Sequence, residues 1–270
     1  MGGRLVSRPR VCVITGFGIN ADEELALAFQ MAGGDARRVH VTDLIAEPGL
    51  LSGFRILAFP GGFSFGDHLG SGKVFATLFR RNLGDEMARF VAGGGLVVGI
   101  CNGFQILVKM GVLPDLSRTM GQEVSLIHND SGKYEDRWVT VSFEQGSRCV
   151  WTRGLRQMDL PVRHGEGRFV ARSPELLAEL AARGLIALRY ASSSGGDPKY
   201  PEDPNGSDGH VAGICDPTGR VFGLMPHPEA FIHAENHPDW TARSVTEGEG
   251  LRIFANGVSA AAQAGPSTST

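Results

Sequence analysis

The stretch from Val97 to Leu107 reads V-V-G-I-C-N-G-F-Q-I-L and joins two apolar patterns through a turn that is flanked by glycine. The apolar run before the turn, from Leu96 to Ile100, predicts a strand that is buried on both faces. The run after it, which contains Phe104, predicts the beginning of a helix. A strand, a tight turn and a helix in this order are typical of an α/β fold.

Cys101 lies in the middle of the turn, with Gly99 two residues before it and Gly103 two residues after it. Side chains at the flanks of so tight a turn would clash, so glycine is expected there. This spacing is that of a nucleophile elbow, with cysteine in place of serine. The turn would point the sulfur out at the carboxyl end of the strand, where the helix N-terminus favours a thiolate.

A thiol nucleophile needs a base, and the base needs an orienting group. The candidate base is His227, in the segment V-F-G-L-M-P-H-P-E that ends at Glu229. The prolines on both sides of His227 hold the backbone extended, which places Glu229 on the same side of the chain. The carboxylate can then accept the Nδ1–H and leave Nε2 to face the thiol. The sequence therefore favours Cys101, His227 and Glu229 as a catalytic triad.

His164 is the rival for the role of base. It opens the polar, glycine-rich segment H-G-E-G-R, which follows an apolar run. His164 lacks the proline-fixed carboxylate that follows His227, although Glu166 lies two residues after it. We prefer His227, but residue chemistry alone leaves this choice open.

Two other patterns indicate different kinds of site. Gly16 to Ala21, with Asp43 after a second strand, imitates a dinucleotide-binding fingerprint whose third glycine is missing. His233 and His237 have the spacing of metal ligands, but Pro238 ends the helix that would align them. We expect neither a bound dinucleotide nor a metal.

The composition limits the classes of partner. The chain has 270 residues, 42% of them hydrophobic, and a formal net charge of −3, which indicates neither nucleic acid nor a membrane surface as a partner. Four irregularly spaced cysteines suggest no disulfide framework, and because no apolar stretch follows the short basic segment 1–9, we expect no signal peptide there. We expect a cytoplasmic protein with an N-terminal extension over 1–9, one domain over 10–258 and a flexible tail over 259–270.

The order of the expected elements predicts a doubly wound α/β fold: a mostly parallel sheet with helices on both faces and an antiparallel extension. Strands are predicted over residues 11–15, 37–41, 56–59, 96–100, 186–190, 211–215 and 221–224. Helices are predicted over residues 22–32, 72–81, 83–92 and 174–183, with Asn20 or Asp22 as the cap of the first and Ser173 as the cap of the last. Residues 123–143 alternate like antiparallel strands. A polar loop over 192–207 is too long to be a simple connection.

The motifs G-I-C-N-G-F-Q and P-H-P-E resemble those of the class I (triad) glutamine amidotransferases. More closely, the chain is similar to the glutaminase subunits of phosphoribosylformylglycinamidine synthase, from purine biosynthesis. Four more stretches match these subunits in the same order: P-G-G-F-S-F-G-D from Pro60, H-N-D-S-G-K-Y-E from His128, H-G-E-G-R-F from His164 and P-N-G-S from Pro204. Together they cover the chain from about Arg10 to Glu229.

The resemblance implies that the chain hydrolyses glutamine to glutamate and ammonia, with Cys101 as the nucleophile. The backbone amides of Asn102 and of Gly62 or Phe63 would form the oxyanion hole, because only glycine lets a backbone come so near. Gln105 is expected near the amino-acid end of the substrate. His128 and Asn129 lie where the family binds glutamine and contacts its partner, although a polar hairpin explains them equally well.

The resemblance also implies a separate synthetase subunit that uses the ammonia to convert formylglycinamide ribonucleotide to the amidine, and it leaves room for a small accessory subunit. This chain carries no phosphate-binding loop, so we expect no cofactor on it and place ATP and Mg on the synthetase. The alternatives are an amidotransferase for another acceptor, a free-standing cysteine hydrolase, a silent scaffold or regulatory protein, and a nucleotide-binding oxidoreductase.

Overall fold

A large mixed sheet runs through the part of the chain that the computed structural model describes, residues 8–242 and 247–263. Its strand order is β2-β1-β3-β4-β11-β10-β9-β6-β7. The first five strands are parallel: β2 (Asp35–His40), β1 (Arg10–Thr15), β3 (Ile56–Phe59), β4 (Leu96–Ile100) and β11 (Val221–Leu224). The antiparallel extension comprises β10 (Val211–Cys215), β9 (Ile186–Tyr190), β6 (Glu135–Phe143) and β7 (Gln157–His164). This confirms the predicted fold class.

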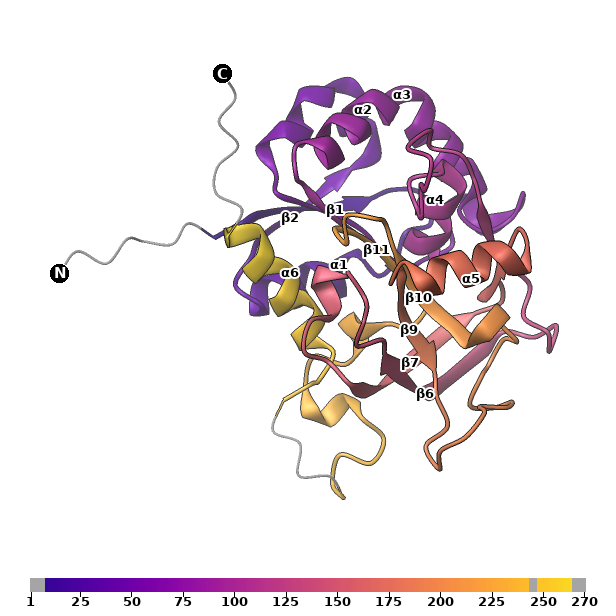
Figure 1. Cartoon of the computed structure of the whole chain (residues 1–270). Coiled ribbons are helices and arrows are strands. Elements are labelled where there is room, and N and C mark those ends of the chain that lie inside the picture. The colour runs from indigo at the N-terminus through magenta and orange to yellow at the C-terminus, as the bar shows by residue number, and fades with distance from the viewer. Residues whose placement is uncertain (1–7, 243–246, 264–270) are drawn as a thin grey trace.

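Helices cover both faces of the parallel strands (Figure 1). One face carries α2 (Val41–Ala46), α3 (Lys73–Ala92) and α4 (Asn102–Met110), and the other carries α1 (Asp22–Met31) and α6 (Leu251–Gln263). The central strands β3, β4 and β11 are buried at every residue, because helices pack on both sides of them. Their continuous apolar runs are the sequence signal of such strands.

A smaller two-stranded sheet joins β5 (Val124–Ile127) to β8 (Arg168–Ala171), and α5 (Pro174–Ala182) follows it. The antiparallel character predicted for residues 123–143 is therefore confirmed, but its two strands do not pair with each other. β5 pairs with β8, whereas β6 lies between β9 and β7 in the large sheet. The segment between β5 and β6 is thus a connection between two sheets.

Several predicted boundaries were wrong for local reasons. The two helices predicted over 72–81 and 83–92 are one helix, in which Asn82 Nδ2 donates to Leu78 O within the helix. Ala21 is the cap residue of α1, with no side-chain cap from Asn20 or Asp22. The Ser173 cap of α5 is confirmed, since its side chain accepts a hydrogen bond from Leu176 N.

The expected flexible tail began too early. Helix α6 continues to Gln263 and buries Val258 and Ala261, so residues 259–263 are helical. Residues 264–270 of that tail, like residues 1–7 of the expected N-terminal extension, lie outside the described part of the chain.

Candidate active site

The carboxyl ends of β3, β4 and β11 bring the candidate residues together, because these three strands are neighbours in the sheet. Ile100, the last residue of β4, lies opposite Leu224, the last residue of β11. The next residue, Cys101, donates its backbone N–H to Leu224 O over 2.8 Å. His227 follows β11 directly, and the glycine loop from Pro60 follows β3. The parallel register therefore places nucleophile, base and loop at one edge of the sheet.

The turn at Cys101 has the strained geometry of a nucleophile elbow. Cys101 has φ 51° and ψ −105°, a conformation that non-glycine residues rarely adopt. A Cβ on Gly99 would lie 2.6 Å from the carbonyl carbon of Gly103. A Cβ on Gly103 would overlap the carbonyl of Phe59 on β3. Glycine on both sides is thus required for helix α4 to leave the sheet at this angle.

His227 and Glu229 form a buried pair beside this turn. His227 Nδ1 lies 2.6 Å from Glu229 Oε1, and the two residues are 5% and 2% exposed. Burial alone would lower the pKa of His227, but the Glu229 carboxylate and Cys101 raise it to about 10. His227 is therefore an imidazolium at neutral pH. Its Nε2 is buried without a hydrogen-bond partner among the described residues, and Cys101 is one of the groups that raise the pKa of His227, so Nε2 is available to the thiol.

The other cysteines have the character of buried apolar residues. Cys12, Cys149 and Cys215 are almost fully buried. Burial raises the pKa of Cys12 to about 12 and that of Cys149 well above its usual value. Among the described residues no histidine contributes to the pKa shift of either thiol, whereas Cys101 and His227 interact.

His164 lies near His227 but has no carboxylate partner among the described residues. Burial and the charge of His227 lower the pKa of His164 to about 3, so its ring is neutral. Its Nδ1 lies 3.0 Å from the amide oxygen of Asn129. Glu166, the carboxylate that could have served it, instead accepts a hydrogen bond from Ser71 N. The structure therefore favours His227 over His164 as the base.

Gly62 and Phe63, the two candidate oxyanion-hole donors in the loop that follows β3 (residues 60–67, here called the oxyanion loop), differ in the hydrogen bonds that their N–H groups make. The N–H of Phe63 donates to Gly18 O over 2.8 Å, which engages it within the protein. The N–H of Gly62 donates to no group in the described residues, and Gly62 has φ +151°, which favours glycine. Asn102 is the first residue of α4, so its N–H has no acceptor within the helix. In this conformation Gly62 and Asn102 fit the role, whereas Phe63 does not.

The side chains of Asn102 and Gln105 are bonded inside the protein. Asn102 Oδ1 accepts from Ser64 N, and its Nδ2 donates to Gln105 Oε1 over 2.9 Å. Gln105 Nε2 donates to Glu166 O over 2.6 Å. The two residues thus connect the first turn of α4 to the oxyanion loop and to the segment after β7.

His128 and Asn129 have different surroundings. His128 is exposed, whereas Asn129 is 3% exposed and turns inward. Asn129 Nδ2 donates to His164 O over 2.8 Å, and its Oδ1 accepts from Gly167 N over 2.9 Å. The amide of Asn129 therefore holds the backbone after β7.

Two further groups at the site were not predicted from the sequence as site residues, although Tyr134 belongs to the matched stretch that begins at His128. The backbone carbonyl of Arg163 lies 3.5 Å from Cys101 Sγ. Tyr134 is 51% exposed, and burial and the nearness of Cys101 both raise its pKa. Its ring lies 6.2 Å from that of Phe63. These neighbours come from β7 and the connection before β6, and their proximity depends on long-range pairing that residue spacing does not encode.

Neither a metal centre nor a membrane span is found within the described ranges. No three His, Cys, Asp or Glu side chains gather there as metal ligands would. His237, from the suggested metal pattern, instead packs its ring 4.7 Å from that of Trp138. None of the described helices is long and apolar enough to cross a membrane.

Comparison with known proteins gives consistent matches along most of the chain. Residues 8–259 match the family of the CobB/CobQ-like glutamine amidotransferase domain. The chain is 42% identical over 260 residues to phosphoribosylformylglycinamidine synthase subunit PurQ of Dehalococcoides mccartyi, which covers 96% of this chain and 100% of that one. It is 42% identical over 235 residues to the subunit of the same name from Methanococcus maripaludis, covering 86% of each. A chain in the structure of PurLQS from Thermotoga maritima is similar with a TM-score of 0.71 and 30% identity, covering 93% of this chain and 98% of that chain.

Proposed function

This chain belongs to the CobB/CobQ-like glutamine amidotransferases and, within them, to the PurQ subunits of phosphoribosylformylglycinamidine synthase, and we propose that its glutaminase reaction uses Cys101, His227 and Glu229. It is the glutaminase component of the synthase and works with a synthetase subunit in purine biosynthesis. The buried His227–Glu229 pair beside the elbow of Cys101 is the observation that supports this assignment.

The proposed reaction uses the two charge states of His227, the imidazolium and the neutral ring. Cys101 Sγ attacks the side-chain carboxamide carbon of glutamine, and the carbonyl oxygen becomes an oxyanion. The imidazolium of His227 gives its Nε2 proton to the leaving nitrogen, ammonia departs, and a glutamyl thioester remains on Cys101. Neutral His227 then takes a proton from water, whose oxygen attacks the thioester and releases glutamate. Glu229 holds the ring orientation and stabilises the imidazolium throughout.

The N–H groups of Gly62 and Asn102 stabilise the oxyanion in this proposal. They come from the ends of β3 and β4, which are adjacent strands. Gln105, Asn129 and the exposed His128 border the same edge of the sheet. Because Gln105 and Asn129 already bond to the protein, they shape the glutamine pocket through the backbone they hold.

The ammonia must reach a separate active site. ATP and Mg²⁺ bind the synthetase, which converts formylglycinamide ribonucleotide to the amidine, and this chain acts in the cytoplasm without a cofactor of its own. Large side chains are exposed near the oxyanion loop: Phe63 at 44%, Leu69 at 75% and Tyr134 at 51%. Their apolar surface suits a docking face for the synthetase around the mouth of the site.

The test is a complete reconstitution. The chain, its synthetase, glutamine, formylglycinamide ribonucleotide and MgATP should give glutamate and amidine in equal amounts. Replacing glutamine by ammonium chloride should keep amidine formation in the Cys101→Ser complex, which cannot release glutamate. Amidine from glutamine in that variant complex, or glutamate without any rise in amidine for the wild type, would contradict the proposal.

A further inference from the structure

A buried asparagine lies behind the active site and has no part in the reaction above. Asn205 belongs to the sequence P-N-G-S at the end of the long polar loop, and it is 1% exposed. A buried carboxamide has to find hydrogen-bond partners. The identity of these partners indicates what the residue does.

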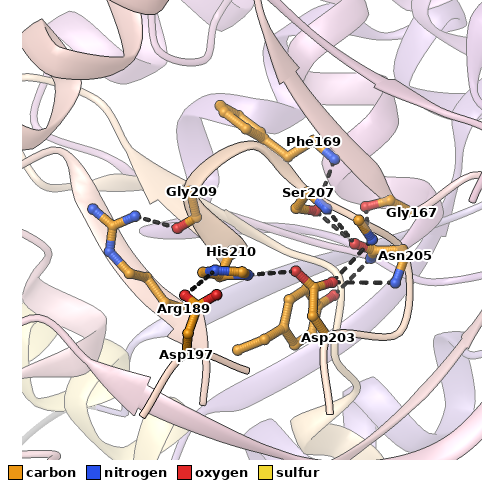
Figure 2. Close-up of polar contacts among 11 residues, drawn as sticks. Gly167, Phe169, Arg189, Asp197, Asp203, Asn205, Ser207, Gly209 and His210 are labelled. Atoms are coloured by element: carbon orange, nitrogen blue, oxygen red, sulfur yellow. Dashed lines mark hydrogen bonds and ion pairs between the residues drawn. The ribbon is translucent and has the colours of Figure 1, made fainter. Parts of the chain in front are cut away.

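All four hydrogen-bonding positions of the Asn205 amide are used, and Figure 2 shows the contacts with Gly167 and Ser207. Its Nδ2 donates to Gly167 O and to Tyr190 Oη, both over 3.0 Å. Its Oδ1 accepts from Ser207 N over 3.1 Å and from Ser207 Oγ over 2.6 Å. Because a backbone carbonyl requires a donor and a backbone N–H an acceptor, the amide has one possible orientation. An aspartate, with oxygen at both positions, could not replace it.

Gly167 closes the segment 163–167, which borders the active site. Three carboxamides from distant parts of the chain hold the backbone of this segment: Gln105 bonds Glu166 O, Asn129 bonds His164 O and Gly167 N, and Asn205 bonds Gly167 O. The segment begins at Arg163, whose carbonyl lies 3.5 Å from Cys101 Sγ. A displacement at Gly167 would therefore disturb the same backbone segment whose first carbonyl lies against the thiol.

The turn that carries Asn205 is itself braced by charged side chains. Asp203 Oδ1 accepts from the N–H groups of Asn205 and Gly206 over 3.2 and 3.0 Å. His210 lies between two carboxylates, 2.7 Å from Asp203 Oδ2 and 3.0 Å from Asp197 Oδ1 (Figure 2). These contacts hold the turn rigid, so that the position of the Asn205 amide is set from outside the active site.

We propose that Asn205 is a positioning residue for the glutaminase reaction, which fixes the Gly167 carbonyl and, through the segment 163–167, the position of Cys101 Sγ relative to His227. This inference rests on the proposed function. A misplacement of about 1 Å at a reacting group costs about 10²-fold in rate. The effect should fall on kcat, since the bonded segment places the nucleophile.

The test compares two Asn→Asp variants in the complex with the synthetase. Asn205→Asp puts a carboxylate oxygen against Gly167 O with almost no change of shape. The matched control is Asn256→Asp on α6, since Asn256 Nδ2 likewise makes two hydrogen bonds, in its case to the carbonyls of Trp151 and Arg153, outside the active site. The readouts are kcat and KM for glutamine, the thermal midpoint, and the rate at which iodoacetamide alkylates the peptide that contains Cys101.

We expect Asn205→Asp to lower kcat by about 10²-fold with KM unchanged, and to slow alkylation of Cys101 in parallel. Asn256→Asp should lower the thermal midpoint but leave kcat and the rate of Cys101 alkylation unchanged. Equal kcat and equal alkylation in the two variants would overturn the positioning role. If Asn205→Asp does not fold, Ser207→Ala is the second variant: it removes the Oγ bond to Asn205 Oδ1 and the acceptor of the Phe169 N–H. It should lower kcat severalfold, and an unchanged kcat there would overturn the role too. Lack of glutamine turnover by the wild-type complex would instead refute the proposed function.

Discussion

The separate contributions of His227 and Glu229 to the reaction rate can be measured by replacing each residue in turn. His227→Ala should lower glutaminase kcat by about 10²- to 10⁴-fold, because it removes the group that moves the proton. Glu229→Gln should cost less, because it keeps a hydrogen-bond acceptor for Nδ1 and alters only charge. Steady-state kinetics of the two variant complexes give this order.

The same pair makes a prediction about protonation. Among the groups that raise the pKa of His227, Glu229 has the largest effect. In Glu229→Gln the pKa of His227 should therefore fall well below about 10. An NMR titration of the His227 ring checks this.

Wild-type rates in His227→Ala would show that another group is the base, and His164 would be the first to examine.

His164 should make the protein sensitive to acid. Its pKa of about 3 in the folded chain is below its ordinary value of 6.5, so protons bind the unfolded chain more readily. The stability that this residue contributes is therefore present above pH 6.5 and is lost as pH falls toward 3. From pH 7 to pH 5 the loss amounts to about 2 kcal/mol.

The His164→Asn variant isolates this contribution, since its amide can still reach the oxygen of Asn129 and carries no titrating group. Urea unfolding at pH 7 and pH 5 should show a fall in the free energy of unfolding that is smaller in the variant by about 2 kcal/mol. Equal falls in both proteins would show that His164 titrates normally in the folded state.

At the scale of elements, the contact between α4 and β3 depends on a single missing side chain. In Gly103→Ala the new Cβ would overlap the carbonyl of Phe59, and neither backbone can move without shifting a central element. We expect a loss of about 1–3 kcal/mol in the free energy of unfolding, together with loss of activity as Cys101 is displaced.

Gly146→Ala is the matched control, because a Cβ there meets nothing within 4 Å. Urea unfolding of both variants provides the comparison. A Gly103→Ala protein as stable and as active as Gly146→Ala would show that the elbow tolerates a wider turn than we describe.

The sequence predicted the elements that local pattern determines. The strands around Cys101 and Glu229 are buried on both faces, so their apolar runs are unambiguous, and adjacent prolines and glycines mark where they end. The helices predicted over 72–81 and 83–92 are one helix, in which the Asn82 side chain bonds back to Leu78 O, and residue type alone does not reveal such a bond. The oxyanion candidates Gly62 and Phe63 could not be separated, because Gly18, the acceptor for Phe63, is far away in the chain.

Asn129 and Asn205 show the same limit at the site. Both belong to polar, glycine-containing stretches that are typical of surface turns, yet both are buried. Their partners, His164 and Gly167, are 35 and 38 residues away in the sequence. A carboxamide can be buried only where such carbonyls are available to accept its hydrogen bonds. Because these carbonyls are distant in the sequence, residue spacing does not predict them.

At the scale of the whole molecule, the isolated chain should be nearly idle. Cys101 is 5% exposed, and of the two candidate donors in the loop after β3 only Gly62 has a free N–H among the described residues, because the N–H of Phe63 is bonded to Gly18 O. Phe65 and Asp67, in the same loop, have φ values of 55° and 53°, so the loop is strained and can rearrange when the synthetase docks. Alignment of one additional oxyanion donor is worth about 10²- to 10³-fold in rate.

Glutaminase turnover of the purified chain, alone and with the synthetase and acceptor nucleotide, measures this dependence. We expect stimulation of at least about 10²-fold. Full turnover by the chain alone, unchanged when the synthetase is added, would refute the proposed activation by docking and favour a free-standing hydrolase.

The most direct measurement of the central claim is to trap the covalent intermediate. The complex is mixed with glutamine, quenched in acid during turnover, digested and mapped by mass spectrometry, and the same is done with a glutamine-like electrophile. The glutamyl thioester and the label should both lie on the peptide that contains Cys101, and both should be absent from Cys101→Ser, which should fold normally and show no turnover. An adduct on Cys12, Cys149 or Cys215 with Cys101 unmodified, or turnover by Cys101→Ser, would contradict the account.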